Sequence, residues 1–422
     1  QASTYAMMRF VSVAIIVATS SNVEAFRSVP TFSRPASSLS VATDPDKLLF
    51  VDATTETTRK QVQDYYGQTL QTSDDLATNA CCTAGAPPTY IQECLNRINP
   101  TTLKKYYGCG LCLPSYDLEG CSVLDLGCGA GRDVYIASQL VGKEGRVVGV
   151  DMTPEQLETA KEYQDYHSEK FGFANTEFHQ GYLESLDDID ALEKESFDVI
   201  ISNCVINLCT DKPAVLKACY DLLKPGGELY FSDVYANRRV PETLQKNPLL
   251  WGECLSGALY WNDFQNMAKQ AGFNDPRLVE DAPITVESKK VQNMIDSEGH
   301  SSIKFFSATY RLFKMPELEP ACEDFGQAVI YKGTLPRAES GWLLDKHHYF
   351  EAGRIHPVCG NTWFMLKNRN LADHFDFVGD FSRHYGIFEG CGSSLPYDLQ
   401  PASTGKGTSI ESNSSGNGGG CC

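Results

Sequence analysis

Short apolar runs alternate with longer amphipathic segments between residues 121 and 232. Strands are predicted at 122–126, 146–150, 176–179, 197–202 and 228–232. Helices are predicted between most of them, at 132–141, 154–171 and 211–223. Nearly continuous apolar strands separated by helices are typical of a parallel sheet whose two faces are both covered. The pattern therefore predicts a doubly wound α/β core.

The segments that flank this core follow other patterns. Helices are predicted at 55–66 and 89–106, and a helical stretch runs from Asp233 to about Gly272. Shorter β-rich runs lie further along the chain, at 277–279, 303–312, 328–331 and 348–350. We expect these parts in order: a pre-sequence at 1–43, an N-terminal helical cap at 44–120, the core at 121–315 with a helical insertion at 234–272, a small separate α+β domain at 316–400, and a flexible Ser/Gly-rich tail at 401–422 that ends in two cysteines.

The first 43 residues have the composition of a targeting segment. After Met7 or Met8, an apolar stretch at 11–19 leads to Val23-Glu24-Ala25, where Val23 and Ala25 have the spacing of a signal cleavage site. Residues 26–43 contain no acid. This order resembles bipartite plastid targeting, so we expect a plastid location. Plain secretion, or an upstream extension of a cytoplasmic protein, is the alternative.

Charge and cysteine content narrow the function classes. The formal net charge is −18 with a pI near 4.9, which repels phosphate backbones and argues against nucleic acid as a partner. No apolar run reaches the roughly 20 residues that a membrane-spanning helix needs, so no membrane partner is expected. Sixteen cysteines in a long α/β chain favour soft-ion binding or redox chemistry over a disulfide framework.

A glycine-rich turn follows the first predicted strand. Gly127, Gly129 and Gly131 have the spacing G-x-G-x-G, and two acids, Asp125 and Asp133, lie beside them. The glycines allow a tight turn and close approach to a ligand. Acids so near would disfavour a pyrophosphate, but they suit the sulfonium and ammonium groups of S-adenosylmethionine (SAM).

Further cofactor residues follow from topology, because ligands of doubly wound sheets bind beyond the carboxyl ends of the strands. Asp151 ends the second predicted strand, where an acid can accept hydrogen bonds from a ribose diol. The predicted SAM-binding residues from these strand ends are Asp125, Gly127, Gly129, Gly131, Asp151, Met152, Gly181, Tyr182 and Asn203. Cys204, at the end of the fourth strand, should face the transferable methyl group. Together with Lys224-Pro225-Gly226-Gly227, this unit resembles the class I SAM-dependent methyltransferases.

Five further segments carry a more specific resemblance. They read YYGCG at 106–110, SNCVINL at 202–208, LYFSDVY at 229–235, WGECL at 251–255 and FSATYRLFK at 306–314, and they resemble the arsenite methyltransferases. The resemblance implies three thiolate ligands for As(III), Cys109, Cys204 and Cys254. It also implies a relay cysteine at Cys81, for which the adjacent Cys82 is an alternative, and contact of Tyr107 with SAM.

The chemistry is consistent with this assignment, since soft thiolates select thiophilic ions. A thiolate-bound As(III) keeps a lone pair that can attack the SAM methyl group without a general base. Methylation formally oxidises arsenic, and cysteine thiols can reduce it again by forming a disulfide. Thioredoxin, glutaredoxin or glutathione would then restore the thiols. Arsenite and methylarsenicals are the expected substrates of a chain expected to be monomeric.

Two alternatives remain open. The chain could be a SAM-dependent methyltransferase of another small metabolite, in which case the cysteines would be incidental. It could instead be a thiol protein without catalysis: either an arsenic-binding module, or a zinc or redox protein built on the C-x-x-C pair Cys109 and Cys112. A structural zinc site would need a second ligand pair, and none is evident in the sequence.

Overall fold

The computed structural model describes residues 51–64, 87–106, 108, 110, 112–245, 250–251, 254–285, 289–297 and 303–389. The predicted pre-sequence at 1–43 and the predicted tail at 401–422 lie outside these residues.

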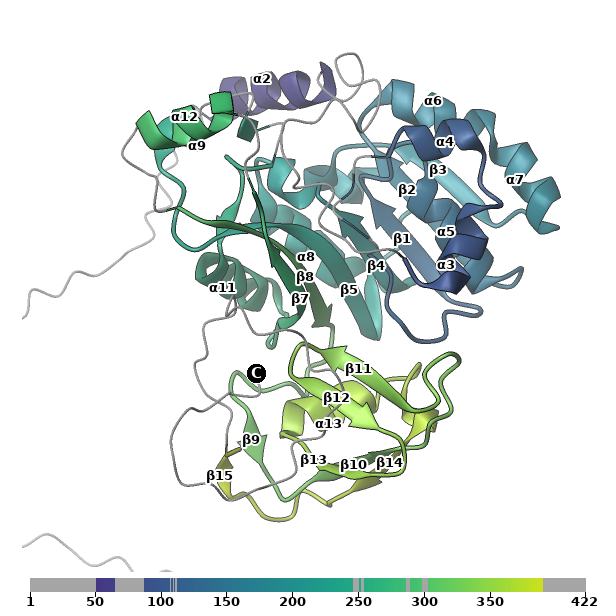
Figure 1. Ribbon diagram of the computed structural model, residues 1–422, viewed down its shortest axis with the longest axis vertical. Coiled ribbons are helices and arrows are strands. Elements are labelled where there is room, and N and C mark those ends of the chain that lie inside the picture. Colours follow the sequence, from purple (N-terminus) through teal and green to yellow (C-terminus); the bar gives the residue numbers. More distant parts are fainter. Residues whose placement is uncertain are drawn as a thin grey trace, which may run out of the picture. The chain divides into compact units, whose positions relative to one another are not determined.

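A central mixed sheet forms the core and carries strands in the order β3-β2-β1-β4-β5-β8-β7 (Figure 1). Neighbours from β3 to β5 pair in parallel, whereas β8 is antiparallel to both β5 and β7. The short β6 pairs with the end of β5. The bounds are β1 Ser122–Leu126, β2 Arg146–Asp151, β3 Thr176–Gln180, β4 Phe197–Asn203, β5 Leu223–Ala236, β6 Leu259–Tyr260, β7 Arg277–Pro283 and β8 Phe305–Phe313. The five predicted core strands and the doubly wound α/β sheet are confirmed.

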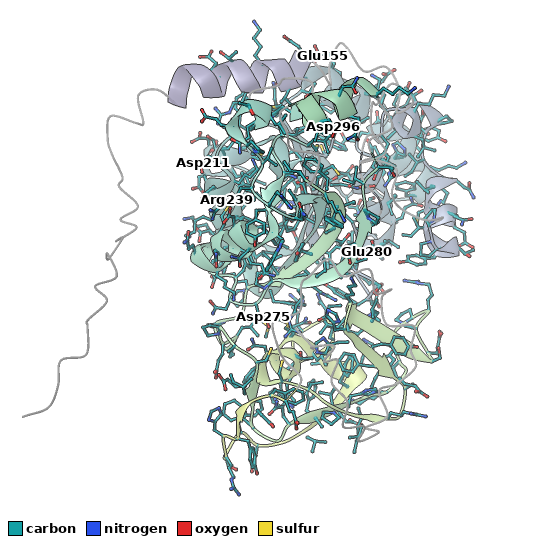
Figure 2. The ribbon with its side chains drawn as sticks, turned by 60° about the vertical axis from the view of Figure 1, so that its left-hand side comes forward. Glu155, Asp211, Arg239, Asp275, Glu280 and Asp296 are labelled. Atoms are coloured by element: carbon teal, nitrogen blue, oxygen red, sulfur yellow. The ribbon has the colours of Figure 1, made fainter. Side chains whose placement is uncertain are left out.

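Successive side chains of a strand point to opposite faces of the sheet, so alternate residues of the central strands pack against opposite helical layers. Val123 of β1 packs in one hydrophobic cluster with α5 (Arg132–Val141) and α6 (Pro154–Glu162). Leu124 of the same strand packs with α8 (Lys212–Leu222) and α11 (Trp261–Ala271) in the other. Asp211, labelled in Figure 2, accepts a hydrogen bond from the Ala214 amide at 3.0 Å and so caps the start of α8.

Two predicted helices are each divided in the structure. The segment predicted as one helix at 89–106 forms α3 (Thr89–Leu95) and α4 (Pro100–Lys104). Proline lacks an amide hydrogen and clashes with the preceding turn, so Pro100 begins a new helix, which Asn99 caps. The segment predicted at 154–171 forms α6 and α7 (Gln164–Phe171), which meet at Tyr163.

The stretch predicted as a helical insertion at 234–272 is only partly helical. Strand β5 continues into it as far as Ala236, because β8 pairs with β5 along its length, from Glu228–Phe313 to Ala236–Phe305. The described remainder contains α9 (Glu242–Gln245), β6 and α11.

The C-terminal region has the predicted α+β character, but it does not have a core of its own. Its Val329, Trp342 and Phe375 belong to the same hydrophobic cluster as Val123 of the central sheet. The Trp342 indole also donates to the Ser115 carbonyl at 3.3 Å. The elements are β9 Glu323–Asp324, β10 Ala328–Tyr331, β11 Gly341–Asp345, β12 His348–Glu351, β13 Ile355–Pro357, α13 Gly360–Leu366, η6 Ala372–His374, β14 Phe375–Val378 and β15 Gly386–Ile387. 

The remaining described elements are α2 Val51–Asp64, η4 Leu183–Asp188, η5 Ile206–Leu208 and α12 Lys289–Ser297. Of these, η4 and η5 contribute to the hydrophobic cluster of α8 and α11. No helix among the described residues is long and apolar enough to cross a membrane.

Candidate active site

A cleft lies where β1 to β4 end, as the topology predicts for this fold. It holds about 1030 Å³ of space, its open mouth included. The residues that line it come from the glycine-rich turn, from the ends of β2, β3 and β4, and from two N-terminal segments. They are Arg59, Val62, Lys105, Tyr106, Gly108, Asp125, Gly127, Cys128, Gly129, Ala130, Arg132, Asp133, Asp151, Met152, Thr153, Gln156, Gly181, Leu183, Glu184, Asn203, Cys204, Val205, Leu208 and Cys209.

The glycine-rich turn is fixed to the neighbouring strand by backbone hydrogen bonds. Gly127, Gly129 and Gly131 have φ of 74°, 51° and 86°, a region that strongly favours glycine. The Gly127 amide donates to the Val150 carbonyl at 2.8 Å. The Asp151 carboxylate accepts from the Gly129 amide and from the Thr153 amide, both at 2.8 Å. Asp151 is therefore held rigidly beside the turn, with lone pairs left for a ligand hydroxyl.

Three carboxylates, Asp125, Asp133 and Asp151, lie in this part of the cleft, and Arg132 pairs with Asp133 at 2.7 Å. Burial raises the pKa of Asp125 well above its usual range, and the charges of Asp133 and Asp151 raise it further. Burial also raises the pKa of Asp151, against the opposing effect of its amide hydrogen bonds. A cationic ligand would relieve this repulsion. The sulfonium and ammonium groups of SAM fit this site, whereas a pyrophosphate does not.

Most residues predicted to bind SAM line this one cleft. They are Asp125, Gly127, Gly129, Asp151, Met152, Gly181 and Asn203. Gly131 and Tyr182 are not among the lining residues. A side chain at Gly131 would meet the Phe178 ring at 3.0 Å, so this glycine serves packing between helix and sheet. Tyr182 is 42% exposed. Tyr107 lies outside the described residues.

Asn203 connects the cofactor cleft to the segment that bears Cys109. Its side-chain amide donates to the Tyr106 hydroxyl at 2.7 Å, to the Gly110 carbonyl at 2.8 Å and to Asp133 at 3.1 Å. The guanidinium of Arg132 stacks on the Tyr106 ring, 3.1 Å from its centroid. The residues on both sides of Cys109 are thus tied to the end of β4, although Cys109 itself lies outside the described residues.

Two of the predicted acceptor cysteines come together at the far end of the cleft. Cys204 lines the cleft and is 3% exposed, and Cys254 is 1% exposed. The Cys254 thiol lies 3.5 Å from the Cys204 carbonyl oxygen, although 50 residues separate them. Both have a left-handed backbone, with φ of 58° and 61°. Strain of this kind in non-glycine residues concentrates at functional sites.

Cys204 is disulfide-bonded in this structure. None of the described cysteines at 94, 112, 121, 128, 209, 219, 254 and 359 takes part in a disulfide. The predicted relay residues Cys81 and Cys82 lie outside the described residues. Within the described part of the chain, no cluster of three or more His, Cys, Asp or Glu side chains could hold a metal ion. The predicted trio includes Cys109, which lies outside the described residues.

Several cleft residues escaped the sequence analysis. Arg59 and Val62 come from α2, and Glu184 comes from η4. Cys128 and Cys209 also line the cleft, but burial raises the pKa of each thiol well above its usual range, so both are neutral thiols. No local motif marks these residues, because only the packing of separate segments brings them to the cleft.

Comparison with known proteins gives concordant matches. Residues 117–272 match the family model for a methyltransferase domain. An arsenite methyltransferase of Aquipseudomonas alcaligenes is 56% identical over 345 residues, which cover 82% of this chain and 98% of that protein. The arsenite methyltransferase of Mus musculus is 47% identical over 324 residues, covering 76% and 83%. The crystal structure of an arsenic(III) S-adenosylmethionine methyltransferase from Chlamydomonas reinhardtii superposes with a TM-score of 0.68 at 45% identity, covering 72% of this chain and all of that one.

Proposed function

The chain belongs to the arsenite methyltransferase family and is a SAM-dependent methyltransferase, and from this premise we propose that it methylates As(III) held by the thiolates of Cys109, Cys204 and Cys254. The observation that carries the proposal is the contact between Cys254 and Cys204 at the end of β4. In the strand order β3-β2-β1-β4, this position is separated from the Asp151 end of the cleft by β1. A SAM molecule with its ribose at Asp151 would direct its methyl group toward β4.

The proposed reaction has two balanced stages. As(OH)₃ exchanges its three hydroxyls for three cysteine thiolates, and each thiol proton leaves with a hydroxyl as water. The arsenic lone pair then attacks the methyl carbon of SAM, the carbon–sulfur bond breaks, and S-adenosylhomocysteine (SAH) leaves as a neutral thioether. The nucleophile carries no proton, so no general base is required. The contribution of the protein is mainly positioning and exclusion of competing nucleophiles.

We further propose a cysteine relay with Cys81 as the donor and Cys82 as its alternative. Methylated arsenic is formally As(V), and its return to As(III) requires two electrons. Two cysteine thiols supply them by forming a disulfide, and thioredoxin, glutaredoxin or glutathione reduces that disulfide by thiol exchange. Because Cys204 is disulfide-bonded in this structure, its sulfur binds arsenic only after that disulfide is reduced by thiol exchange. 

Methylarsenicals are proposed as further substrates, and the chain is proposed to act as a monomer. A plastid location is also a proposal that rests on residues 1–43.

The test of the proposed function is arsenic speciation by chromatography with mass detection, after incubation of the full chain with SAM, arsenite and dithiothreitol. Cys204→Ser should yield no methylarsenicals while it still binds SAM. Cys94→Ser is the matched control, because Cys94 lies on α3 and does not line the cleft. It should retain activity. If the wild-type chain binds SAM but yields no methylated arsenic, the acceptor is another small molecule.

A further inference from the structure

Helix α2 covers one end of the cofactor cleft, although no motif in its sequence marks it as part of the site. Arg59 and Val62 line the cleft, and Val62 is 4% exposed. One residue further along, the Gln63 side-chain amide donates to the Met152 carbonyl at 2.9 Å. Lys60, by contrast, is exposed. One side of this largely polar helix is therefore fitted to the cleft.

Arg59 is held by two neighbours from the β3 side of the cleft. Its Nη2 lies 3.5 Å from the Glu184 carboxylate, and its guanidinium lies 4.8 Å from the centroid of the Tyr182 ring. Glu184 is fixed in turn, because it accepts hydrogen bonds from the amide and hydroxyl of Thr210 at 3.0 and 3.1 Å. The Arg59 side chain is thus oriented before any ligand binds.

The Nε of Arg59 is buried and has no hydrogen-bond partner among the described residues. A buried donor without an acceptor is costly, so its position at a ligand cleft indicates an acceptor on the ligand. The Arg59 contacts Tyr182 and Glu184 follow β3, and Gln63 of the same helix bonds Met152, which follows β2 next to Asp151. This is the ribose-binding end of the cleft in the proposed orientation. Ribose oxygens and adenine ring nitrogens are suitable acceptors there.

We propose that Arg59 is a cofactor-binding residue whose Nε–H donates to the nucleoside of SAM and SAH, and that α2 closes this end of the cleft. Cys204 follows β4, which β1 separates from the Asp151 end of the cleft. Glu184, the partner of Arg59, is also bonded to Thr210 in the loop after Cys204, so nucleoside binding and arsenite binding are measured separately. The inference needs only that the chain binds SAM, and it does not depend on the identity of the methyl acceptor.

The test is isothermal titration calorimetry of the full chain with SAH and, separately, with adenosine alone. Arg59→Met should weaken both ligands roughly tenfold, the loss expected for a hydrogen bond from a charged group. Arg59→Lys keeps the positive charge beside Glu184 but lacks the Nε donor, so it should weaken both ligands to a similar extent. Lys60→Met is the matched control from the exposed side of the same helix and should bind as the wild type does.

Three outcomes would overturn the inference. Wild-type affinity for SAH in Arg59→Met would remove Arg59 from the site. Wild-type affinity for both ligands in Arg59→Lys would show that Arg59 contributes through its ion pair with Glu184 and not through its Nε donor. A loss of SAH affinity with unchanged adenosine affinity would move Arg59 to the amino-acid end of the cofactor. An arsenite titration of the reduced variants, followed by tryptophan fluorescence, should match that of the wild type. Failure of the wild type in that titration would contradict the proposed function and not the role of Arg59.

Discussion

At the scale of single residues, the acceptor end of the cleft combines two cysteines with an unfavourable backbone conformation. Only five described non-glycine residues have positive φ, and Cys204 and Cys254 are two of them. Left-handed backbone of this kind costs on the order of 1 kcal/mol or more at each residue, so the surrounding contacts must enforce it. The Cys204 amide donates to the Ser232 carbonyl at 2.8 Å, and the Cys254 amide donates to the Trp251 carbonyl at 2.9 Å. Both cysteine side chains are therefore placed by their backbones.

A second residue-scale feature, remote from the cysteines, makes the stability depend on pH. His167 is 1% exposed, stacks on Tyr135 with ring centroids 3.6 Å apart, and accepts a hydrogen bond from the Asn99 amide at 3.1 Å. Burial lowers its pKa to about 4, from an ordinary value of 6.5. At pH values between these two pKa values, His167 binds a proton in the unfolded chain but stays neutral in the native protein. His167 therefore reduces stability as the pH falls through this window.

Urea unfolding at pH 7.5 and pH 5 should reveal this effect. The loss attributable to His167 at pH 5 is about 2 kcal/mol. His167→Gln cannot titrate, although its amide oxygen can still accept from Asn99, so it should lose correspondingly less stability on acidification. The control is His384→Gln, at an exposed histidine. Equal pH dependence in wild type and His167→Gln would contradict the assignment.

At the scale of elements, the acceptor site is a contact between two loops, each anchored by its own contacts. The loop after β4 includes η5, where the Asn207 amide donates to the Asp233 carboxylate at 2.9 Å. Against it lies the loop with Cys254, and the Trp251 indole joins the two by donating to the Leu208 carbonyl at 3.3 Å. Cys204 and Cys254 keep their relative position only while these loops remain in contact.

Gly257→Ala should separate the two loops. A methyl group at Gly257 would lie 2.1 Å from the Asn207 carbonyl oxygen, which is backbone and cannot turn aside. Overpacking of this size costs about 1–3 kcal/mol. Because this strain falls at the acceptor site, the substitution should lower kcat/KM for arsenite roughly tenfold or more and leave the affinity for SAM unchanged. Gly360→Ala is the control, since the nearest atom there is 3.5 Å away. Equal activity in both variants would show that this contact does not position the cysteines.

At the scale of the described chain, the C-terminal region is fixed to the sheet by shared apolar packing and by buried ions. Asp198 at the start of β4 is 2% exposed and collects three donors from separate segments. They are the Ser122 amide at 2.9 Å, the Lys224 ammonium at 2.7 Å and the Arg369 guanidinium at 2.8 Å. Arg311 of β8 likewise pairs with buried Glu228 at 2.9 Å and donates to the Leu344 carbonyl at 2.8 Å.

Asp198→Ala should destabilise the whole protein, because it removes the acceptor from all three donors at once. The Ser122 amide loses its acceptor, which costs about 1–3 kcal/mol, whereas Lys224 and Arg369 are 31% and 62% exposed and remain hydrated. Arg369→Ala should cost at most about 1 kcal/mol, since that side chain is 62% exposed. Guanidinium-induced unfolding of both variants checks the ranking. A larger loss for Arg369→Ala would mean that the docking of the C-terminal region, and not the buried carboxylate, limits stability.

The sequence by itself determined the positions of the core strands, the glycine-rich turn and most of the strand-end residues that line the cleft. Strand periodicity and turn chemistry are local, so they can be read along the chain at 122–126 or 127–131. The cysteine motifs came from resemblance, and the structure brings Cys204 and Cys254 together while Cys81, Cys82 and Cys109 lie outside its described residues.

Only the tertiary structure decided which distant segments meet. Pairing with β8 extends β5 to Ala236, and packing against the sheet merges the C-terminal region with the central core. Arg59 on a polar helix became a cleft residue through contacts with Glu184 and Tyr182, which lie more than 100 positions along the chain. Such contacts depend on the free energy of burying separate surfaces together, and that quantity has no periodicity in the sequence.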